Sequence, residues 1–186
     1  MLSILFTFIL IGIPGTTGFS SLEKPAFSGC GDWIPVDYED KTLCVTPDYY
    51  AVDGVRTPVG MREALAIAAQ EGASLPTPGM VDAIWEQADI KLSPIPMTPG
   101  PEMTSVAYYQ RHHAMIEEQL EGLDVEGMLI AGHKKDIVQQ QVEGKVTIYG
   151  WHKSDGKPIQ PVYSGHHAEY RDYSHGLRLV RWADSH

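Results

Sequence analysis

The chain has 186 residues, of which 43% are hydrophobic, so it can bury one sizeable core but is too short for two full domains. Its formal net charge is −10 at pH 7, and its 14 Lys and Arg residues are spread along the sequence. Because phosphate contacts need clustered cations, this composition excludes a broad nucleic-acid-binding face. We therefore expect one acidic domain with no nucleic-acid partner.

The N-terminal segment has the pattern of an export signal. Residues 2–13 are apolar, Pro14 and Gly15 break the run, and small residues follow where a signal peptidase cuts. The run is shorter than the roughly 20 apolar residues that span a bilayer. No Lys or Arg stands near Met1, which leaves an uncleaved anchor as the alternative. We predict a signal peptide at 1–18, a single domain at 19–186, a secreted or periplasmic location, and no stable membrane span after signal removal.

The chain contains two cysteines, Cys30 and Cys44, which flank a short loop. An even pair in an exported chain predicts a disulfide bond, since export compartments are oxidising. The alternative is a pair of free thiols in a cytosolic protein. Neither the spacing nor the neighbouring residues indicate a metal-binding or catalytic thiol.

Three helix signals follow an irregular N-terminal part, in which only residues 42–45 predict a strand. Thr57 before Pro58 predicts a capping hydroxyl and a proline at the first helical position, and apolar residues continue at helical spacing until Gly72. Thr77 before Pro78 predicts the same start for a second helix.

Prolines between residues 94 and 101 predict an extended linker, because proline stops helix propagation. Thr104 or Ser105 then caps a third helix. Its expected inner face contains Val106, Tyr109, His113, Ile116 and Leu120. On this pattern His113 points toward the core or a cleft, and His112 lies on the flank.

The C-terminal part is rich in β-branched, aromatic and aliphatic residues between turn signals, which predicts short strands. The expected strands are 128–131, 146–149, 159–163 and 177–182, with a tight turn at 154–156. The predicted fold class is α+β, with two or three helices packed on a C-terminal antiparallel sheet.

All eight histidines lie between His112 and His186, and several stand at predicted strand ends. Imidazole is the side chain best suited to proton transfer near neutral pH. We predict catalytic roles for His133, His152, His175, Tyr173 and Arg178, and substrate contacts from Lys134, Trp151 and Tyr170. The alternative for residues 134–136, and for the polar stretch 164–178, is a solvated loop.

Metal binding is one use of these side chains. Catalytic zinc takes about three ligands from His, Asp or Glu and leaves one position open for water. The candidate ligands are His133, His152, His166, His175 and Asp136, with Asp172 as an alternative. No strong zinc-binding motif is present.

A metal-free use is acid–base cleavage of an acidic polysaccharide. One histidine acts as the base, Tyr173 or Tyr170 donates a proton, and Arg178 or a lysine neutralises a carboxylate. Ser174 is a poor nucleophile for this site, because neighbouring residues on a strand point to opposite faces and His175 cannot easily activate it.

Three resemblances bear on these residues. Residues 174–178, Ser-His-Gly-Leu-Arg, resemble the Ser-His-Gly-Cys-x-Arg motif of L,D-transpeptidases, but Leu177 stands where their nucleophilic cysteine belongs. Trp151-His152 with Ser174-x-Gly176 faintly resembles the D-Ala-D-Ala metallopeptidases, in reversed order. Phrases such as Gly-His-Lys-Lys-Asp, Tyr-Gly-Trp-His and Asp-Tyr-Ser-His-Gly, between Leu75 and Gly176, resemble a group of exported bacterial proteins of unknown role. This last resemblance implies a self-contained exported domain and supplies no activity.

The sequence therefore supports several functional hypotheses. The first is an exported hydrolase that acts on a cell-envelope or extracellular polymer through the histidine-rich site, with or without zinc. The second is a non-catalytic module that binds envelope glycans or peptides through exposed aromatic and Arg side chains. A polysaccharide lyase and a structural envelope component are the remaining alternatives.

Overall fold

The computed structural model describes residues 29–183, so the predicted signal peptide lies outside the described part of the chain. The elements in chain order are β1 (Ile34–Tyr38), β2 (Lys41–Val45), β3 (Ala51–Val52), β4 (Val55–Arg56), α1 (Met61–Gln70), α2 (Pro78–Gln87), β5 (Ile90–Lys91), the 3-10 helix η1 (Pro101–Thr104), α3 (Val106–Leu120), β6 (Ile130–Ala131), β7 (Lys135–Ile137), β8 (Ile148–His152), β9 (Pro158–Tyr163), β10 (His175–Gly176) and β11 (Val180–Trp182). The predicted α+β class is confirmed.

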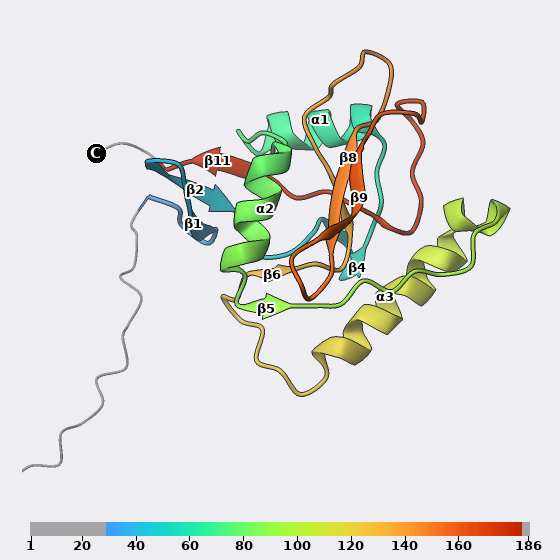
Figure 1. Cartoon of the computed structure of the whole chain (residues 1–186), viewed down its shortest axis with the longest axis horizontal. Coiled ribbons are helices and arrows are strands. Elements are labelled where there is room, and N and C mark those ends of the chain that lie inside the picture. The colour runs from blue at the N-terminus through green and yellow to red at the C-terminus, as the bar shows by residue number, and fades with distance from the viewer. Residues whose placement is uncertain (1–28, 184–186) are drawn as a thin grey trace, which may run out of the picture.

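Two main sheets form the framework (Figure 1). The smaller one has the order β1-β2-β11 and is antiparallel throughout. The larger one has the order β10-β7-β8-β9, in which β7, β8 and β9 are antiparallel neighbours and β10 runs parallel to β7. Two-stranded pairs, β3-β4 and β5-β6, complete the strands that the structure describes.

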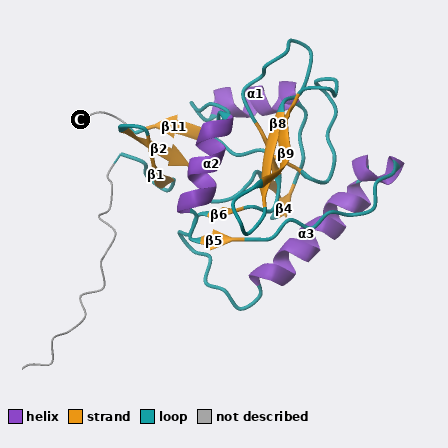
Figure 2. Cartoon of the chain, in the orientation of Figure 1, coloured by secondary structure: helices purple, strands orange, loops and turns teal. Residues whose placement is uncertain are grey.

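Helix α1 packs on the larger sheet, and α2 lies between the two sheets (Figure 2). Met61 and Ala64 of α1 join Ile137 and Ile148 of the larger sheet in a buried apolar cluster. Helix α2 contributes apolar side chains to a second cluster with the smaller sheet, and its Asp82 bonds to β8 of the larger one. Strand side chains alternate between faces, so neighbouring residues of β7 serve different sides of the molecule.

The two N-terminal helices begin for different reasons. Thr77 caps α2 as predicted, since its hydroxyl accepts a hydrogen bond from the backbone N–H of Met80 at 3.2 Å. The predicted cap at Thr57 is wrong, because its hydroxyl donates to the Val55 carbonyl and α1 starts only at Met61. The backbone N–H of Met61 donates instead to the Ala168 carbonyl at 2.7 Å, so a distant loop replaces the local cap.

The third helix begins at Ser105, whose hydroxyl accepts from the backbone N–H of Tyr108, but its inner face differs from the prediction. The buried positions are Tyr109, His112 and Ile116, whereas Val106 is 67% exposed. His112, not His113, therefore points inward. The buried face of α3 is thus turned relative to the predicted one. His112 contacts the buried Lys134, and His113 faces Arg56.

Only the last three residues of the predicted strand at 177–182 form a strand, β11, which pairs with β2. His175 and Gly176, just before the predicted strand, form β10 and pair with β7 in the other sheet. Between β10 and β11, the Arg178 side chain turns inward and donates to the carbonyls of Thr46 and Ile130. These bonds give acceptors to two of the nitrogen atoms of the buried guanidinium.

The disulfide prediction is confirmed, since Cys30 and Cys44 are bonded across a sequence separation of 14 residues. The bond ties the start of the described chain to β2. Across residues 29–183, no helix combines the length and the apolar character needed to cross a membrane.

Candidate functional site

The candidate residues gather around β7, the strand that joins β10 to β8. His175 lies opposite Lys135, and Lys135 lies opposite Gly150 on the other side. The side chains of Lys134 and Lys135 contact different parts of the molecule. Lys134 bonds to His112 of α3, whereas the Lys135 ammonium lies 5.2 Å from the centre of the Trp151 ring. Trp151 has a φ of 59°, a conformation that non-glycine residues rarely adopt and that often occurs at functional sites.

Gly176 allows close packing at this point of the sheet. A Cβ atom at position 176 would come within 2.6 Å of the Tyr49 ring and 2.8 Å of Cβ of Lys134. Any larger residue would therefore displace Tyr49 or Lys134. The glycine that the sequence places after His175 is explained by this approach.

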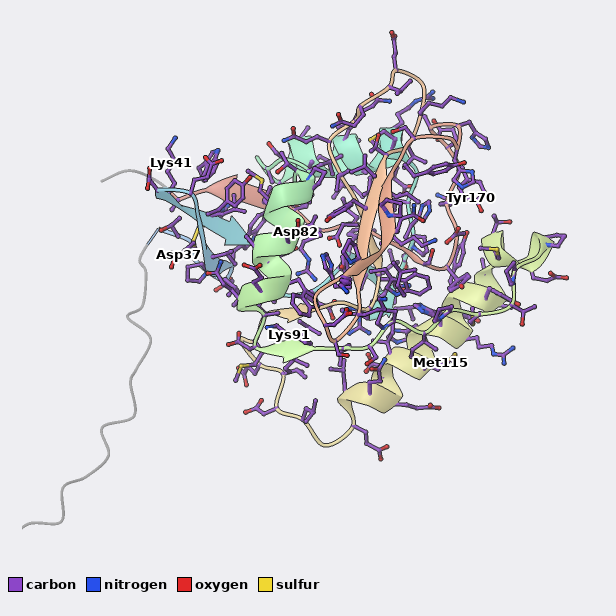
Figure 3. All side chains as sticks on the ribbon, in the orientation of Figure 1. Asp37, Lys41, Asp82, Lys91, Met115 and Tyr170 are labelled. Atoms are coloured by element: carbon purple, nitrogen blue, oxygen red, sulfur yellow. A yellow bond between two sulfur atoms is a disulfide. The ribbon has the colours of Figure 1, made fainter. Side chains whose placement is uncertain are left out.

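The predicted histidines do not converge on one point. Three of them each lie next to a different aspartate. His133 Nε2 donates to Asp48 at 3.0 Å, and His152 Nε2 donates to Asp82 at 2.8 Å. His175 Nε2 lies 3.7 Å from Asp172. Figure 3 shows the labelled Asp82 on α2 and the labelled Tyr170, which neighbours His175, well apart on either side of the β8–β9 hairpin.

This dispersal bears on the metal hypothesis. Among residues 29–183, no three His, Cys, Asp or Glu side chains are grouped so that they could hold a metal ion. The predicted ligands His133, His152, His166, His175 and Asp136 are accordingly not brought together as a ligand set. Each of the three aspartate–histidine pairs lacks the third ligand that zinc requires.

One group of titratable side chains does reach the surface, and we call it the Lys135 site. It comprises Lys135, Trp151, His166, Tyr170, Asp172 and His175. His166 stacks on Tyr170 with ring centres 3.9 Å apart, and the Tyr170 ring lies 5.7 Å from His175. Tyr163 continues the row outward, 5.2 Å from His166. The row runs from Tyr163, which is 43% exposed, to His175, which is 1% exposed.

The anion of the Lys135 site is Asp172, at its base. Burial acts to raise the pKa of this carboxyl, but His175, the hydrogen bonds from Ser174 and the nearby Lys135 outweigh burial and hold the pKa below its usual value. The Ser174 backbone N–H and hydroxyl both donate to Oδ1, and the Tyr170 hydroxyl donates to Oδ2 at 3.2 Å. Ser174 is thus committed to Asp172 and unavailable as a nucleophile, in agreement with the sequence argument.

The pKa values of the other titratable groups of the site are shifted in different directions. Burial lowers the pKa of His166, and Lys135 adds to the effect, so this imidazole is neutral at pH 7. Burial and the Asp172 carboxylate raise the pKa of Tyr170 to about 12, which keeps its proton in place. Burial also lowers the pKa of Lys135, and Asp172 opposes the shift. Within residues 29–183, the Lys135 ammonium has no hydrogen-bond or ion-pair partner.

A second polar network holds α3 to the strands. Arg56, whose side chain is 8% exposed, pairs with both Asp48 and Glu117. Burial acts to raise the pKa of Asp48, but His133 and Arg56 hold it well below its usual range. Burial lowers the pKa of His133 to about 4. The network fixes His133 as a neutral, fully buried ring, which fits a structural role.

Two other predicted catalytic residues are engaged away from the Lys135 site. The Tyr173 hydroxyl accepts from the Met97 backbone N–H at 2.7 Å, so this phenol binds a neighbouring loop. Arg178 is fully buried, donates to backbone carbonyls and stacks on Tyr49 with 4.2 Å between the guanidinium carbon and the ring centre. Burial raises the pKa of Asp136 to about 6, and the Tyr49 hydroxyl donates to it at 2.9 Å. These contacts support the interior of the fold.

The sequence argument included His166, Tyr170 and His175 but gave no site role to Lys135, and it offered Asp172 only as an alternative metal ligand. The alternation of side chains along a strand could have identified Lys135, since consecutive lysines at the start of a strand must point to opposite faces. Asp48 and Asp82, the partners of His133 and His152, lie 85 and 70 residues away in the chain. No local pattern connects them to their histidines.

Comparison of the chain with protein-family models, with curated proteins and with solved structures finds no match. The site therefore has to be interpreted from its own chemistry.

Proposed function

We propose that this protein is an exported lyase that cleaves an acidic polysaccharide at the Lys135 site by metal-free acid–base chemistry. The observation that carries the proposal is the half-exposed row Tyr163, His166 and Tyr170 beside a partly buried Lys135 ammonium that has no ion-pair partner among the described residues. Stacked aromatic rings suit sugar faces, and an unpaired cation suits a carboxylate. The Cys30–Cys44 disulfide and the predicted signal at 1–18 support a secreted or periplasmic location.

The proposed reaction assigns one role to each group. Lys135 binds the carboxylate of a uronic acid and stabilises the negative charge that develops when the neighbouring carbon loses its proton. His166, neutral at pH 7, removes that proton. The Tyr170 hydroxyl, which donates to Asp172 at 3.2 Å in the free protein, turns to the leaving oxygen and donates its proton there as the bond to carbon breaks. The products are an unsaturated uronic acid and a free hydroxyl group. Asp172 and His175 position Tyr170 from below.

Elimination fits these residues better than hydrolysis does. Glycoside hydrolysis uses a pair of carboxyl groups that flank the scissile bond. The Lys135 site has one carboxylate, Asp172, which is buried and already accepts hydrogen bonds from Ser174 and Tyr170. A serine mechanism needs an activated hydroxyl, and the Ser174 hydroxyl donates to Asp172 instead of to a histidine.

Local charge favours an anionic ligand although the chain as a whole is acidic. Lys135 and Lys145 both act on His166 electrostatically, and Asp172 is the carboxylate among its neighbours. Desolvation destabilises the Lys135 ammonium in the free protein. A bound carboxylate would reverse this cost, so binding of an anion should raise the pKa of Lys135.

Lyase activity is tested directly by the ultraviolet absorbance of the unsaturated product. Purified protein is incubated with polygalacturonate, alginate and hyaluronan, and with neutral dextran as the control polymer. Lys135→Met, His166→Ala and Tyr170→Phe are each expected to lower kcat by at least about 100-fold. Lys153→Met, on the exposed turn after β8, serves as the matched control and should retain activity. Absence of turnover by the wild type on every acidic polymer would refute the proposal.

A second candidate function is binding without turnover. It is favoured by the deep burial of His175, which is 1% exposed, together with the outward position of Tyr163 at the end of edge strand β9. The same polymers, immobilised, distinguish the two functions. Retention that depends on Lys135 and Tyr163, without any unsaturated product, would identify a binding module.

A further inference from the structure

A buried group of hydrogen-bond donors lies beside Trp151. Lys134 is 1% exposed, and its amine donates to His112 Nδ1 at 3.0 Å and to the Tyr173 carbonyl at 2.5 Å. An ammonium has three protons, so one donor remains. Because His112 accepts at Nδ1, its neutral ring carries the proton on Nε2.

Two further donors are near. Within residues 29–183, His112 Nε2 and Trp151 Nε1 are buried without a hydrogen-bond partner, and the centres of the two rings are 6.3 Å apart. The Ile95 backbone lies next to the His112 ring and opposes part of the fall in its pKa, but its geometry does not complete a hydrogen bond. A buried donor without an acceptor has lost its bond to water and gained none in return, which points to an acceptor that is still to be supplied.

The segment that covers this place, residues 93–100, is attached mainly through side chains of other elements. It has no regular secondary structure and includes no fully buried side chain. Its backbone is held by Gln119 at Ser93, by the Tyr173 hydroxyl at Met97 and by the Tyr108 hydroxyl at Thr98. Met97 packs against the cluster that contains Trp151. Segments with few buried contacts open at low free-energy cost.

We infer that Lys134, His112 and Trp151 form a carboxylate-binding site that becomes accessible when residues 93–100 lift. The available groups all donate, so they require a ligand atom that only accepts, and a carboxylate oxygen meets this requirement. No carboxylate within residues 29–183 pairs with Lys134, so the ligand would supply the missing counter-charge.

The inference deepens the proposed function and rests on it for the identity of the ligand. Trp151 is shared by this second site and the Lys135 site, since the Lys135 ammonium lies 5.2 Å from its ring centre and the His112 ring packs against it at 68°. Two carboxylate sites that share one indole would recognise a polymer with carboxylates on successive sugar residues. The substrate class is then a polyuronate.

Binding should depend on pH through Lys134. Burial, and secondarily Arg56, lower the pKa of this amine to about 7, while Asp172 and Asp48 oppose the shift. The other groups that face it are the neutral His112 from α3 and the Tyr173 carbonyl. A carboxylate binds the ammonium form, so affinity should fall about tenfold per pH unit above this pKa, and binding should take up protons.

The test follows the indole N–H signal of Trp151 by NMR while ligand is added to the full-length protein. The probes are galacturonate as a sugar acid, N-acetylglutamate as a peptide-like acid, and galactose as the neutral control. A saturable shift with either acid supports the carboxylate site, and a shift with galacturonate alone supports the sugar acid. No shift with either acid, or an equal shift with galactose, would overturn the inference.

Variants separate this site from the Lys135 site. Lys134→Met should abolish the shift, whereas Lys135→Met should retain it. Trp151→Phe keeps an aromatic ring but removes the N–H, and should weaken galacturonate binding about five- to tenfold by calorimetry with the fold intact by circular dichroism. The shift can persist in a protein without lyase activity, which would refute the proposed function alone. Lyase activity without any shift would refute the second site alone.

Discussion

The buried amine of Lys134 should leave a measurable mark on the pH dependence of folding. Its pKa falls from 10.5 to about 7 in the native protein, with burial as the main cause and Arg56 as the next. In the unfolded chain the amine titrates near its ordinary value. Between these two values the unfolded chain holds a proton that the native protein has lost, so stability rises with pH over this range.

The expected magnitude follows from the shift. Each pKa unit corresponds to about 1.4 kcal/mol, and the native amine is half protonated near pH 7. Because Lys134 is 1% exposed, solvent screening takes little from this figure. The wild type should therefore gain about 2 kcal/mol of unfolding free energy between about pH 7 and about pH 9, relative to a variant without the amine.

Lys134→Met is the variant for this measurement, with Lys135→Met as the control on the same strand. Urea denaturation at several pH values gives the free energy of unfolding of each protein. The comparison uses the difference in slope between proteins, since the absolute stability of Lys134→Met also reflects the acceptors left at His112 and Tyr173. Equal slopes for the wild type and Lys134→Met above pH 7 would show that the amine keeps its proton in the native state, and the reasoning would fail.

Three further predictions concern stability and can be measured by urea denaturation. Arg56→Met should cost about 3 kcal/mol, because it leaves Asp48 without its buried guanidinium, whereas Glu117→Gln should cost at most about 1 kcal/mol, because the Glu117 side chain is 52% exposed. Equal costs would contradict the idea that the buried Arg56–Asp48 pair carries most of the stabilisation. Replacing Cys30 and Cys44 together by alanine should lower stability by about 3 kcal/mol, and the gap should vanish when the wild type is reduced. Thr77→Ala should cost about 1 kcal/mol through loss of the α2 cap, while Thr57→Ala should cost clearly less, and the reverse order would mean that the caps are misassigned.

The local features of the fold could be predicted because their causes are local. Thr77 and Pro78 specify the start of α2 whatever surrounds them, since the capping bond spans three residues. Thr57 before Pro58 is the same pattern, but no helix begins there. Helix α1 begins at Met61, where the backbone N–H of Met61 donates to the Ala168 carbonyl. On α3, helical spacing predicts which stripe is apolar but cannot choose between adjacent histidines, and the buried Lys134 amine decides in favour of His112.

By itself, the sequence determined the α+β class, the disulfide pair and the concentration of imidazoles near strand ends, because composition, cysteine pairing and short-range periodicity act over a few residues. Only the tertiary structure decided which carboxylate each histidine faces: Asp48 reaches His133 across 85 residues, and Asp82 reaches His152 across 70. It also decided that Lys134 is fully buried and Lys135 only partly. Chain packing sets these partners and their desolvation, and desolvation in turn sets the pKa values on which any chemistry here depends.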